Sequence, residues 1–413
     1  MKKHTEILIL GGGISGCTSA RFLQRPWQIL EKESLPGGLS TQYQSGGFWF
    51  DFGGHYFHFM QSPEIRDLLT GIVPFNRYRR RSKIWLFQRL IPFPLQSHLE
   101  NLPPRYRDQI RSELALSRDS GGDSLRDSLR STFGPTLYEI FFHPFMTKYY
   151  RRNLRDMSRG MEKGSIPPPS TQNRRKSGQD NQQGYNPEFF YPTGGLRRFW
   201  ESYAKPQLQG IRLRETVVRV DLQGRLVETD RHTYSFKWLI NTIPLPQFLS
   251  MLSGFPLASE MPGCLRHSST RVTNMVLARR RRRFHWVYLP EATTPYYRMG
   301  YYPNAGVCKA YLEETIVPTR SRLSTESDAA EILAGLGVIR EKSEILYFSQ
   351  RTIPISYVQF DKAWFQNVPA TLERLRRKKV FSIGRYGSWN YTSMAVDALA
   401  ARNCAEFINL ERS

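Results

Sequence analysis

The amino-terminal part of the chain has the apolar pattern of a parallel α/β unit. The run EILIL predicts a buried strand, ISGCTSARFL the start of an amphipathic helix, and WQILEK a second short strand. Gly11, Gly13 and Gly16 lie between the first strand and the helix in the spacing G-x-G-x-x-G. Glycines in this pattern permit a tight turn, the approach of a pyrophosphate to the backbone, and close helix–strand packing. The segment therefore predicts a dinucleotide-binding βαβ unit.

Later segments predict a second half of the same fold. The stretch from IRLRET to KWLINTIP alternates apolar and polar residues, with Gly224 at a turn, and predicts a small β-meander that returns to the first unit. VFSIGRYGSW predicts a strand and a glycine turn, and MAVDALAARNCAEFI a helix. We expect an α/β protein with a Rossmann-type fold, a helical insertion and a mixed-sheet substrate region.

The predicted organisation has five parts, which follow the chain in order. They are 1–75, a βαβ unit with a cofactor-facing turn; 76–190, a mainly helical insertion with a polar loop at 164–188; 191–250, the meander and return; 251–375, a substrate-binding sheet region; and 376–413, a strand, turn and helix.

Charge and cysteine content narrow the classes of function. The 59 Lys and Arg against 36 Asp and Glu give a net charge of +23, a field that attracts anions. The basic clusters at 79–81, 174–176, 279–283 and 374–379 are interpreted as solvated surface or as anion contacts, and no nucleic-acid-binding module is recognisable. Four scattered cysteines indicate neither a zinc site nor a disulfide framework and favour a reducing cytoplasm. No apolar run is long enough for a membrane span, whereas a peripheral membrane contact and the oligomeric state stay open.

The stretch FDFGGHYFHFM places His55 and His58 three residues apart behind two glycines. A metal pair and a cofactor-facing turn are the two interpretations. Metal ligation normally needs a third and often a fourth side chain, and no partner stands at a short spacing. We therefore expect no metal, and the turn against a flat cofactor stays as the second interpretation.

Glu31 ends the second predicted strand, where a carboxylate can accept hydrogen bonds from a ribose. Gly37 and Gly38 follow at once and give an E-x-x-x-x-x-G-G arrangement. The chain here resembles the two-dinucleotide-binding-domain flavoproteins of the amine oxidase type, and the resemblance implies FAD rather than NAD.

A narrower resemblance extends over most of the chain. FDFGGH, LIPFPLQSHLENLP, FFYPTGGL, HWVYLPEATTPYYRM and GRYGSWNY resemble, in order, motifs of the UDP-galactopyranose mutase family. The resemblance implies that Gly54 and His55 lie against the flavin. It likewise implies three sets of contacts: Phe93 and Gln96 to the nucleotide base; Tyr288 and Arg298, with Trp389 and Tyr391, to the substrate; and Gly384, Arg385 and Met394 to the cofactor. Arg298 is expected on the diphosphate.

The implied function is an isomerisation of a nucleotide sugar in cell-surface polysaccharide biosynthesis. It uses reduced FAD and proceeds through an adduct of the sugar with flavin N5. Two alternatives remain: an oxidoreductase of the amine oxidase or protoporphyrinogen oxidase type, and a catalytically silent FAD-binding partner.

Individual residues also keep structural interpretations. Gln96 can cap a helix, Tyr288 can belong to the core, and Arg298 can pair with Glu291 or another surface carboxylate. Thr392 and Ser393 depart from the bacterial pattern of a tyrosine and an acidic residue. A second diphosphate arginine is not evident, with Arg174 or Arg175 as candidates.

Overall fold

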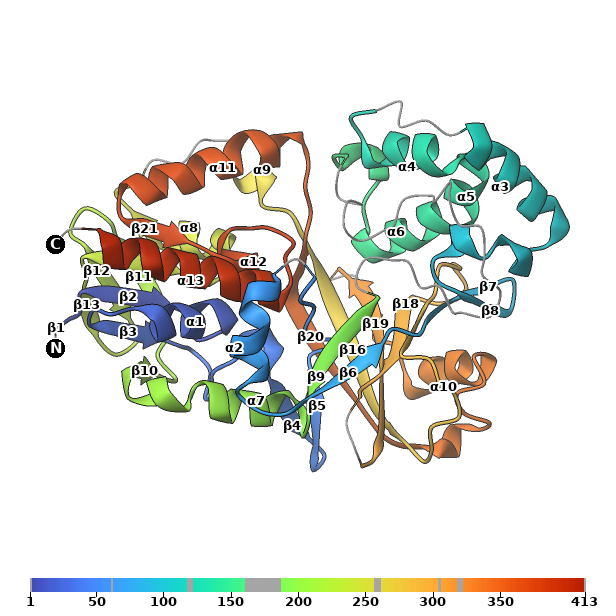
Figure 1. Cartoon of the computed structure of the whole chain (residues 1–413), viewed down its shortest axis with the longest axis horizontal. Helices are drawn as coiled ribbons and strands as arrows, with labels where there is room; N and C mark the ends of the chain where they lie inside the picture. Colours follow the sequence, from blue (N-terminus) through green and yellow to red (C-terminus); the bar gives the residue numbers. More distant parts are fainter. Residues whose placement is uncertain are drawn as a thin grey trace.

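A computed structural model describes residues 2–60, 62–116, 122–159, 187–255, 261–303, 306–317 and 322–411. Figure 1 shows a sheet flanked by long helices on one side of the molecule, with both chain ends at its edge. A group of helices and a large twisted sheet lie on the other side (Figure 1). None of the helices in the described ranges is long and apolar enough to cross a membrane.

The first sheet is entirely parallel. Its strands in spatial order are β10 (Ile211–Arg212), β3 (Trp27–Leu30), β2 (Ile7–Leu10), β14 (Trp238–Asn241) and β21 (Val380–Ser382). All four residues of β2 are buried, as expected for a central strand covered on both faces. Ile7 and Ile9 pack toward the helices α1 (Ile14–Phe22) and α13 (Met394–Leu410).

The opposite face of this sheet is covered by the meander. Leu8 and Leu10 share a hydrophobic cluster with Val217, Val227 and Tyr234. The meander sheet contains β1 (Lys2–His4), β13 (Thr233–Ser235), β12 (Leu226–Thr229), β11 (Val217–Asp221) and β15 (Leu252–Ser253). The helix α8 (Leu245–Met251) packs against β11, and α11 (Lys362–Arg377) packs against β21 of the first sheet and against α9 (Met261–Cys264).

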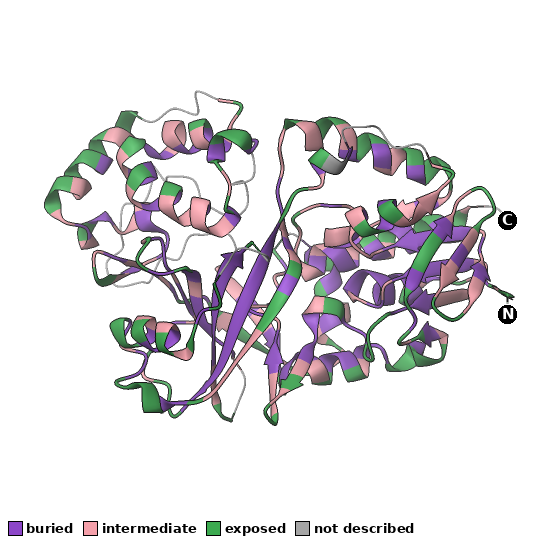
Figure 2. Cartoon of the chain, turned by 180° about the vertical axis from the view of Figure 1, so that it is seen from behind, coloured by how far each residue is buried: buried purple, intermediate pink, exposed green. Residues whose placement is uncertain are grey.

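The large sheet is mixed, because β17 pairs with β7 in parallel whereas its other pairings are antiparallel. Its strands in order are β20 (Ile345–Val358), β16 (His267–Leu277), β19 (Cys308–Ile316), β18 (Tyr296–Tyr301), β17 (Trp286–Tyr288), β7 (Ser82–Leu86) and β8 (Arg89–Pro92). Figure 2 shows that its long central strands are buried along most of their length. One face packs on α10 (Glu326–Gly335), which begins with a capping box between Thr325 and Asp328.

Shorter elements connect these layers. The hairpin β4 (Gln42–Ser45) and β5 (Phe48–Asp51) precedes α2 (Arg66–Thr70), and β6 (Phe75–Arg79) pairs with β9 (Glu188–Pro192), which leads into α7 (Gly195–Tyr203). The helical insertion contains α3 (Pro104–Leu116), α4 (Leu125–Phe133), α5 (Pro135–Leu137), a π-helical turn (Tyr138–Phe142) and α6 (His143–Tyr150). The last short helix is α12 (Gly384–Gly387), directly after β21.

These elements confirm the predicted fold class, with its Rossmann-type sheet, helical insertion and mixed sheet. The meander turn lies at Gly224, whose amide donates to Asp221 Oδ1 over 3.0 Å. Within the range expected to be mainly helical, residues 76–92 instead form most of β6 and all of β7 and β8. Most of the predicted polar loop, 164–186 with Arg174 and Arg175, lies outside the described residues, and Glu188 already belongs to β9.

Candidate functional site

The turn between β2 and α1 contains glycines of two kinds. Gly11 has a φ of 97°, in the region that favours glycine, and a Cβ at Gly16 would lie 2.0 Å from the carbonyl oxygen of Gly11. A Cβ at Gly13 would meet no atom of the described residues within 4 Å. Gly13 immediately precedes α1, at the N-cap position, and no described side chain caps this helix end. The space beside Gly13 and the amides of the first helical turn therefore suit a phosphate.

Three other glycines predicted to contact a cofactor, Gly37, Gly38 and Gly384, gather around this turn. The amide of Gly37 donates to the carbonyl of Gly12 over 2.9 Å, and a Cβ at Gly38 would lie 3.7 Å from the Cα of Gly13. Gly384, at the start of α12, comes so close to Ser15 in α1 that a Cβ there would lie 2.1 Å from its Oγ. Three segments far apart in the sequence thus converge at the ends of β2, β3 and β21.

Glu31 stands at the same edge, immediately after β3. Its carboxylate accepts the amides of Gly12 over 2.7 Å and of Glu33 over 2.8 Å. Burial raises the pKa of Glu31, and the two amide hydrogen bonds oppose that shift. Glu31 therefore ties the glycine turn to the second strand, at the position where a carboxylate can contact a ribose.

The turn that contains His55 packs against the large sheet. A Cβ at Gly53 would lie 2.5 Å from Glu313 Oε1, and one at Gly54 would lie 2.4 Å from the hydroxyl oxygen of Tyr311. Both positions thus require glycine, because any side chain there would collide with the residues of β19 against which the turn packs. The amide of His55 closes the turn by donating to the carbonyl of Gly53 over 3.0 Å.

His55 and His58 have separate surroundings. Burial, together with the nearby charges of Arg385 and Arg298, lowers the pKa of His55 to about 4, so its imidazole is neutral at pH 7. Its Nδ1 is buried and has no hydrogen-bond partner among the described residues. His58 Nδ1 instead lies 3.3 Å from the carbonyl oxygen of Glu188. In the described part of the chain, no three His, Cys, Asp or Glu side chains form a group that could hold a metal.

Arg298 lies on β18, on the face of the sheet that meets the His55 turn. Its Nε donates to Glu313 Oε2 over 2.5 Å and its Nη2 to the hydroxyl of Tyr357 over 3.3 Å. Burial opposes the charge of Arg298, but Glu313 together with Tyr357 and Tyr311 outweighs it, and they hold the pKa of Arg298 well above its ordinary value. Tyr288 is paired directly opposite Arg298 across β17 and β18. The expected alternative partner of Arg298, Glu291, instead accepts the amide of Phe87 over 2.8 Å.

Arg385 is enclosed by aromatic rings. Its guanidinium carbon lies 4.3 Å from the ring centre of Tyr391 and 5.4 Å from that of Tyr357. It also donates to the main-chain oxygens of Thr392 and Ser356, both over 3.4 Å. Within the described ranges no carboxylate lies at ion-pair distance from Arg385. The charges of Arg385 and Arg298 both lower the pKa of the His55 imidazole, so two cationic groups lie in its neighbourhood.

Phe93 and Tyr288 lie together, with their ring centres 5.1 Å apart. Between the strands lies Arg80, only 6% exposed, whose Nη2 donates to the Tyr288 hydroxyl over 3.0 Å. Its guanidinium lies 4.5 Å from the ring centre of Phe93, and burial lowers its pKa. For Arg80 the interpretation of the 79–81 cluster as solvated surface was wrong. The apolar rings that flank Arg80, Phe93 and Trp286, come from other segments of the chain. The arginine run alone therefore did not indicate that Arg80 is buried.

Thr392 and Ser393 have local roles. The Thr392 hydroxyl donates to Asp397 Oδ1 over 2.5 Å, and Ser393 caps α13 by accepting the amide of Val396 over 3.3 Å. Burial raises the pKa of Asp397 to about 6, and the Thr392 hydrogen bond and Arg385 oppose the shift. The carboxyl group of Asp397 therefore lies near Arg385. The position at which the family pattern has an acidic residue is instead Ser393.

Three predicted residues remain at the edge of this arrangement or outside it. Trp389 is fully buried in the cluster beneath the meander, and the indole of Trp364 donates to its carbonyl over 2.9 Å. The structure therefore does not bring its side chain to Arg298 or His55. Gln96 is half-buried in a short helix (Leu95–Ser97), and Met394, the first residue of α13, packs partly buried beside α1.

The comparisons with known proteins agree with this geometry. Residues 9–72 match the family model described as an NAD(P)-binding Rossmann-like domain. Over 99% of this chain and 96% of the other, the structure superposes on a reduced UDP-galactopyranose mutase with a TM-score of 0.89 at 20% identity. The chain has the fold of UDP-galactopyranose mutase.

The same fold is shared with oxidases. A putative protoporphyrinogen oxidase from Exiguobacterium sp. 255-15 gives a TM-score of 0.75 at 16% identity, covering 99% of each chain. A putrescine oxidase bound to putrescine gives 0.69 at 13% identity, covering 100% of each chain. The predicted resemblance to these flavoprotein folds is therefore confirmed at the level of the fold.

Proposed function

We propose that this protein binds FAD and, with the cofactor reduced, isomerises a nucleoside-diphosphate sugar between its ring forms, as a UDP-galactopyranose mutase does. The observation that carries the proposal is the pair of enclosed arginines, Arg298 and Arg385, whose charges both reach the neutral His55. Two guanidinium groups among tyrosine hydroxyls suit a diphosphate and a polyhydroxylated sugar.

The residues around the glycine turn fit FAD. Gly13 leaves room for a pyrophosphate at the start of α1, and Glu31 lies where its carboxylate would accept hydrogen bonds from the hydroxyls of a ribose. Gly384 brings the start of α12 to the same place. When bound, reduced FAD would supply the nucleophile for covalent catalysis at the anomeric carbon.

The chain's own residues would bind and orient the substrate. Arg298 and Arg385 would hold the diphosphate and stabilise the charge that develops on it as the bond to the sugar breaks. Glu313 fixes the side chain of Arg298, because its carboxylate is itself held between that guanidinium and the Gly53 turn. Neutral His55 can accept or donate a hydrogen bond at Nδ1 without adding a third positive charge.

Nucleotide binding to the holoprotein tests the arginine assignment. We expect Arg298→Ala to raise the dissociation constant for UDP about tenfold or more, because a charge-assisted hydrogen bond is lost. The double variant with Glu313→Gln removes the carboxylate that the single change leaves without its cation. Arg322→Ala, an exposed arginine paired with Asp328 on the α10 face, is the matched control. Unchanged UDP affinity in both Arg298 variants, at full FAD content, would remove Arg298 from the site.

The oxidase alternative predicts a different substrate charge. Arg385 among tyrosine rings disfavours a protonated amine, so putrescine and similar amines should neither bind nor reduce the cofactor. Anaerobic mixing followed by flavin absorbance measures this directly. Rapid bleaching by an amine, with peroxide release on admitting oxygen, would favour the oxidase.

A further inference from the structure

The loop between β16 and β17 carries five consecutive arginines, residues 279–283. Only Arg281 pairs with a carboxylate in the described part of the chain; its Nε lies 3.1 Å from Glu344 Oε2. The side chains of Arg279, Arg280, Arg282 and Arg283 are exposed. The loop therefore presents positive charge that local acidic groups do not neutralise.

Several of these guanidinium groups are held in place by the backbone. Arg280 donates to the carbonyl of Phe284 over 2.8 Å, and its guanidinium lies 4.5 Å from the ring centre of Tyr301. Arg282 donates to the carbonyl of Leu336, after α10, over 3.1 Å. Ordered side chains lose less conformational entropy when they bind a partner, so binding through this loop has a smaller entropic cost.

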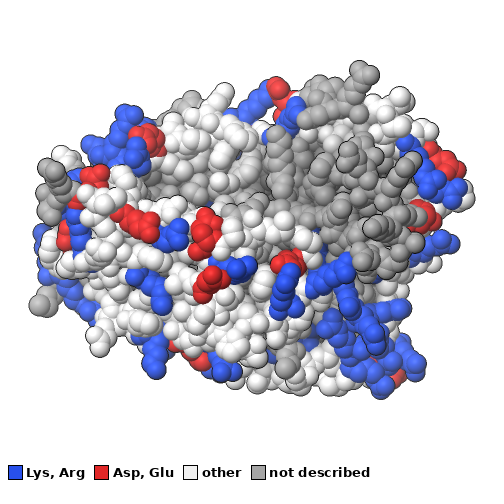
Figure 3. All heavy atoms as spheres, in the orientation of Figure 1, with Lys and Arg blue, Asp and Glu red and all other residues white. Residues whose placement is uncertain are grey.

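Two further exposed arginines extend the positive surface. The amide of Arg81 donates to His285 Nδ1 over 3.0 Å, which joins Arg81 to the end of the run. The amide of Arg340 donates to Glu344 Oε2 over 3.1 Å, the carboxylate that also holds Arg281. We define the basic patch as Arg81, Arg279, Arg280, Arg282, Arg283 and Arg340. Figure 3 shows Lys and Arg gathered in the lower right of this face, where Figure 1 labels α10.

Exposed apolar side chains lie beside the patch. Leu277, the last residue of β16, pairs with Cys308 and with Ile345, the first residues of β19 and β20. Val307 and Leu346, their chain neighbours, therefore stand at the sheet end where the arginine run begins, and they are 47% and 63% exposed. Fixed basic groups beside exposed aliphatic side chains are the combination that binds at a lipid–water interface.

We propose that the basic patch docks the protein on a bilayer surface rich in anionic phospholipid, with Leu346 and Val307 entering the headgroup region. The rings adjoining the arginines, Phe284 and Tyr301, are 5% and 2% exposed, so this surface lacks the stacking platform of a single-strand nucleic-acid site. The proposal is independent of the sugar reaction, since it concerns the end of the sheet and not the residues around His55.

Vesicle sedimentation with the FAD-loaded full chain tests this docking. Binding is expected to vesicles of two parts phosphatidylcholine to one part phosphatidylglycerol, to weaken with added chloride, and to be absent from pure phosphatidylcholine. Replacing Arg279, Arg283 and Arg340 by Gln should reduce the partition coefficient on the order of one hundredfold, and Leu346→Ser should reduce it less. Flavin absorbance and thermal unfolding confirm that each variant is folded.

The matched control replaces Arg212, Arg219 and Arg231 by Gln, exposed arginines around the meander with the same total change in charge. Equal losses in the two triple variants would mean that net charge alone drives binding and would overturn the proposal. So would full competition by inorganic phosphate at matched ionic strength, which would mean a free-ion site. Tighter binding of an oligonucleotide than of anionic vesicles, lost in the patch variant, would assign the surface to nucleic acid instead.

Discussion

Gly13 and Gly16 belong to the same turn, yet the structure predicts different consequences for replacing each by alanine. Gly13 has φ −77° and ψ −170°, which alanine adopts readily, and its Cβ would meet nothing within 4 Å among the described residues. A Cβ at Gly16 would stand 2.0 Å from a backbone oxygen, so the helix or the turn must move. One glycine is thus dispensable to the apoprotein and the other is not.

The magnitudes follow from these distances. Gly13→Ala should change the stability of the apoprotein by about 1 kcal/mol or less, the typical range for such a helix-terminal change. Its methyl group would occupy the space for the pyrophosphate and cost one or two charge-assisted amide hydrogen bonds, about 1.5–3 kcal/mol each. The affinity for FAD should therefore fall at least tenfold, and further with Gly13→Val. Gly16→Ala should destabilise the apoprotein by about 3 kcal/mol or more through overpacking.

Urea unfolding of the flavin-free proteins measures the first quantity, and quenching of FAD fluorescence on titration measures the second. Gly335→Ala is the control, because its Cβ is equally unobstructed but lies at the end of α10, away from the turn. Gly13→Ala with unchanged affinity for FAD would refute the placement of the pyrophosphate. If Gly13→Ala lowered the stability of the apoprotein as much as Gly16→Ala, the inference from the unobstructed space beside Gly13 would be refuted.

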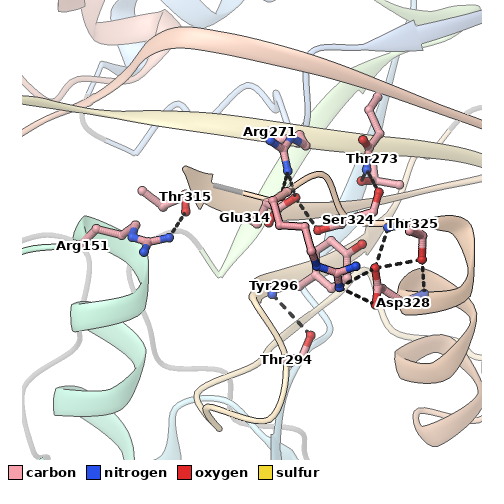
Figure 4. A network of polar contacts seen from close by, with 12 residues as sticks. Arg151, Arg271, Thr273, Thr294, Tyr296, Glu314, Thr315, Ser324, Thr325 and Asp328 are labelled. Atoms are coloured by element: carbon pink, nitrogen blue, oxygen red, sulfur yellow. Dashed lines mark hydrogen bonds and ion pairs between the residues drawn. The ribbon is translucent and has the colours of Figure 1, made fainter. Parts of the chain in front are cut away.

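Three further predictions concern the buried charges of the large sheet and its neighbouring turn. Arg298→Met should destabilise the protein by about 3–5 kcal/mol, because it leaves buried Glu313 without its cation, and adding Glu313→Gln should restore most of this in urea unfolding; no recovery would contradict it. Arg271→Met, which breaks the buried pair with Glu314 on the α10 face (Figure 4), should cost a similar amount but leave UDP affinity unchanged, and a loss of affinity would show that the faces are coupled. The pKa of His55 is about 4 when folded and near the ordinary 6.5 when unfolded, so its contribution to stability is complete above pH 6.5 and is lost as the pH falls toward 4. His55→Gln should flatten the stability profile in that window, and an unchanged slope would argue against a buried neutral imidazole.

Local patterns were sufficient for the elements of the cofactor-type half. The apolar run of β2, the glycine spacing before α1 and the helical spacing of α13 each depend on residues close in sequence, and the structure has all three. The strands β6 to β8 were missed within a range expected to be mainly helical. The partners of β6 and β7, β9 and β17, lie more than one hundred residues away, whereas β8 pairs with its neighbour β7.

The site itself depends on register more than on motifs. Arg298 meets Glu313 because β18 and β19 pair them, and a one-residue shift would turn Glu313 to the α10 face, where Glu314 and Arg271 now lie (Figure 4). Asp397 comes near Arg385 because it lies one helical turn after Thr392 and Ser393. Such neighbours could not be named from residue type and spacing in a single sequence.

Turnover by the reduced enzyme tests the central claim most directly. The FAD-loaded protein is reduced anaerobically with dithionite and incubated with UDP- and TDP-sugars, and the products are separated by chromatography. We expect a ring isomer of one sugar nucleotide to form only with reduced enzyme, over many turnovers, without stoichiometric oxidation of the flavin. No isomer from any sugar, with oxygen-dependent flavin reoxidation coupled to an amine or other reduced substrate, would contradict it.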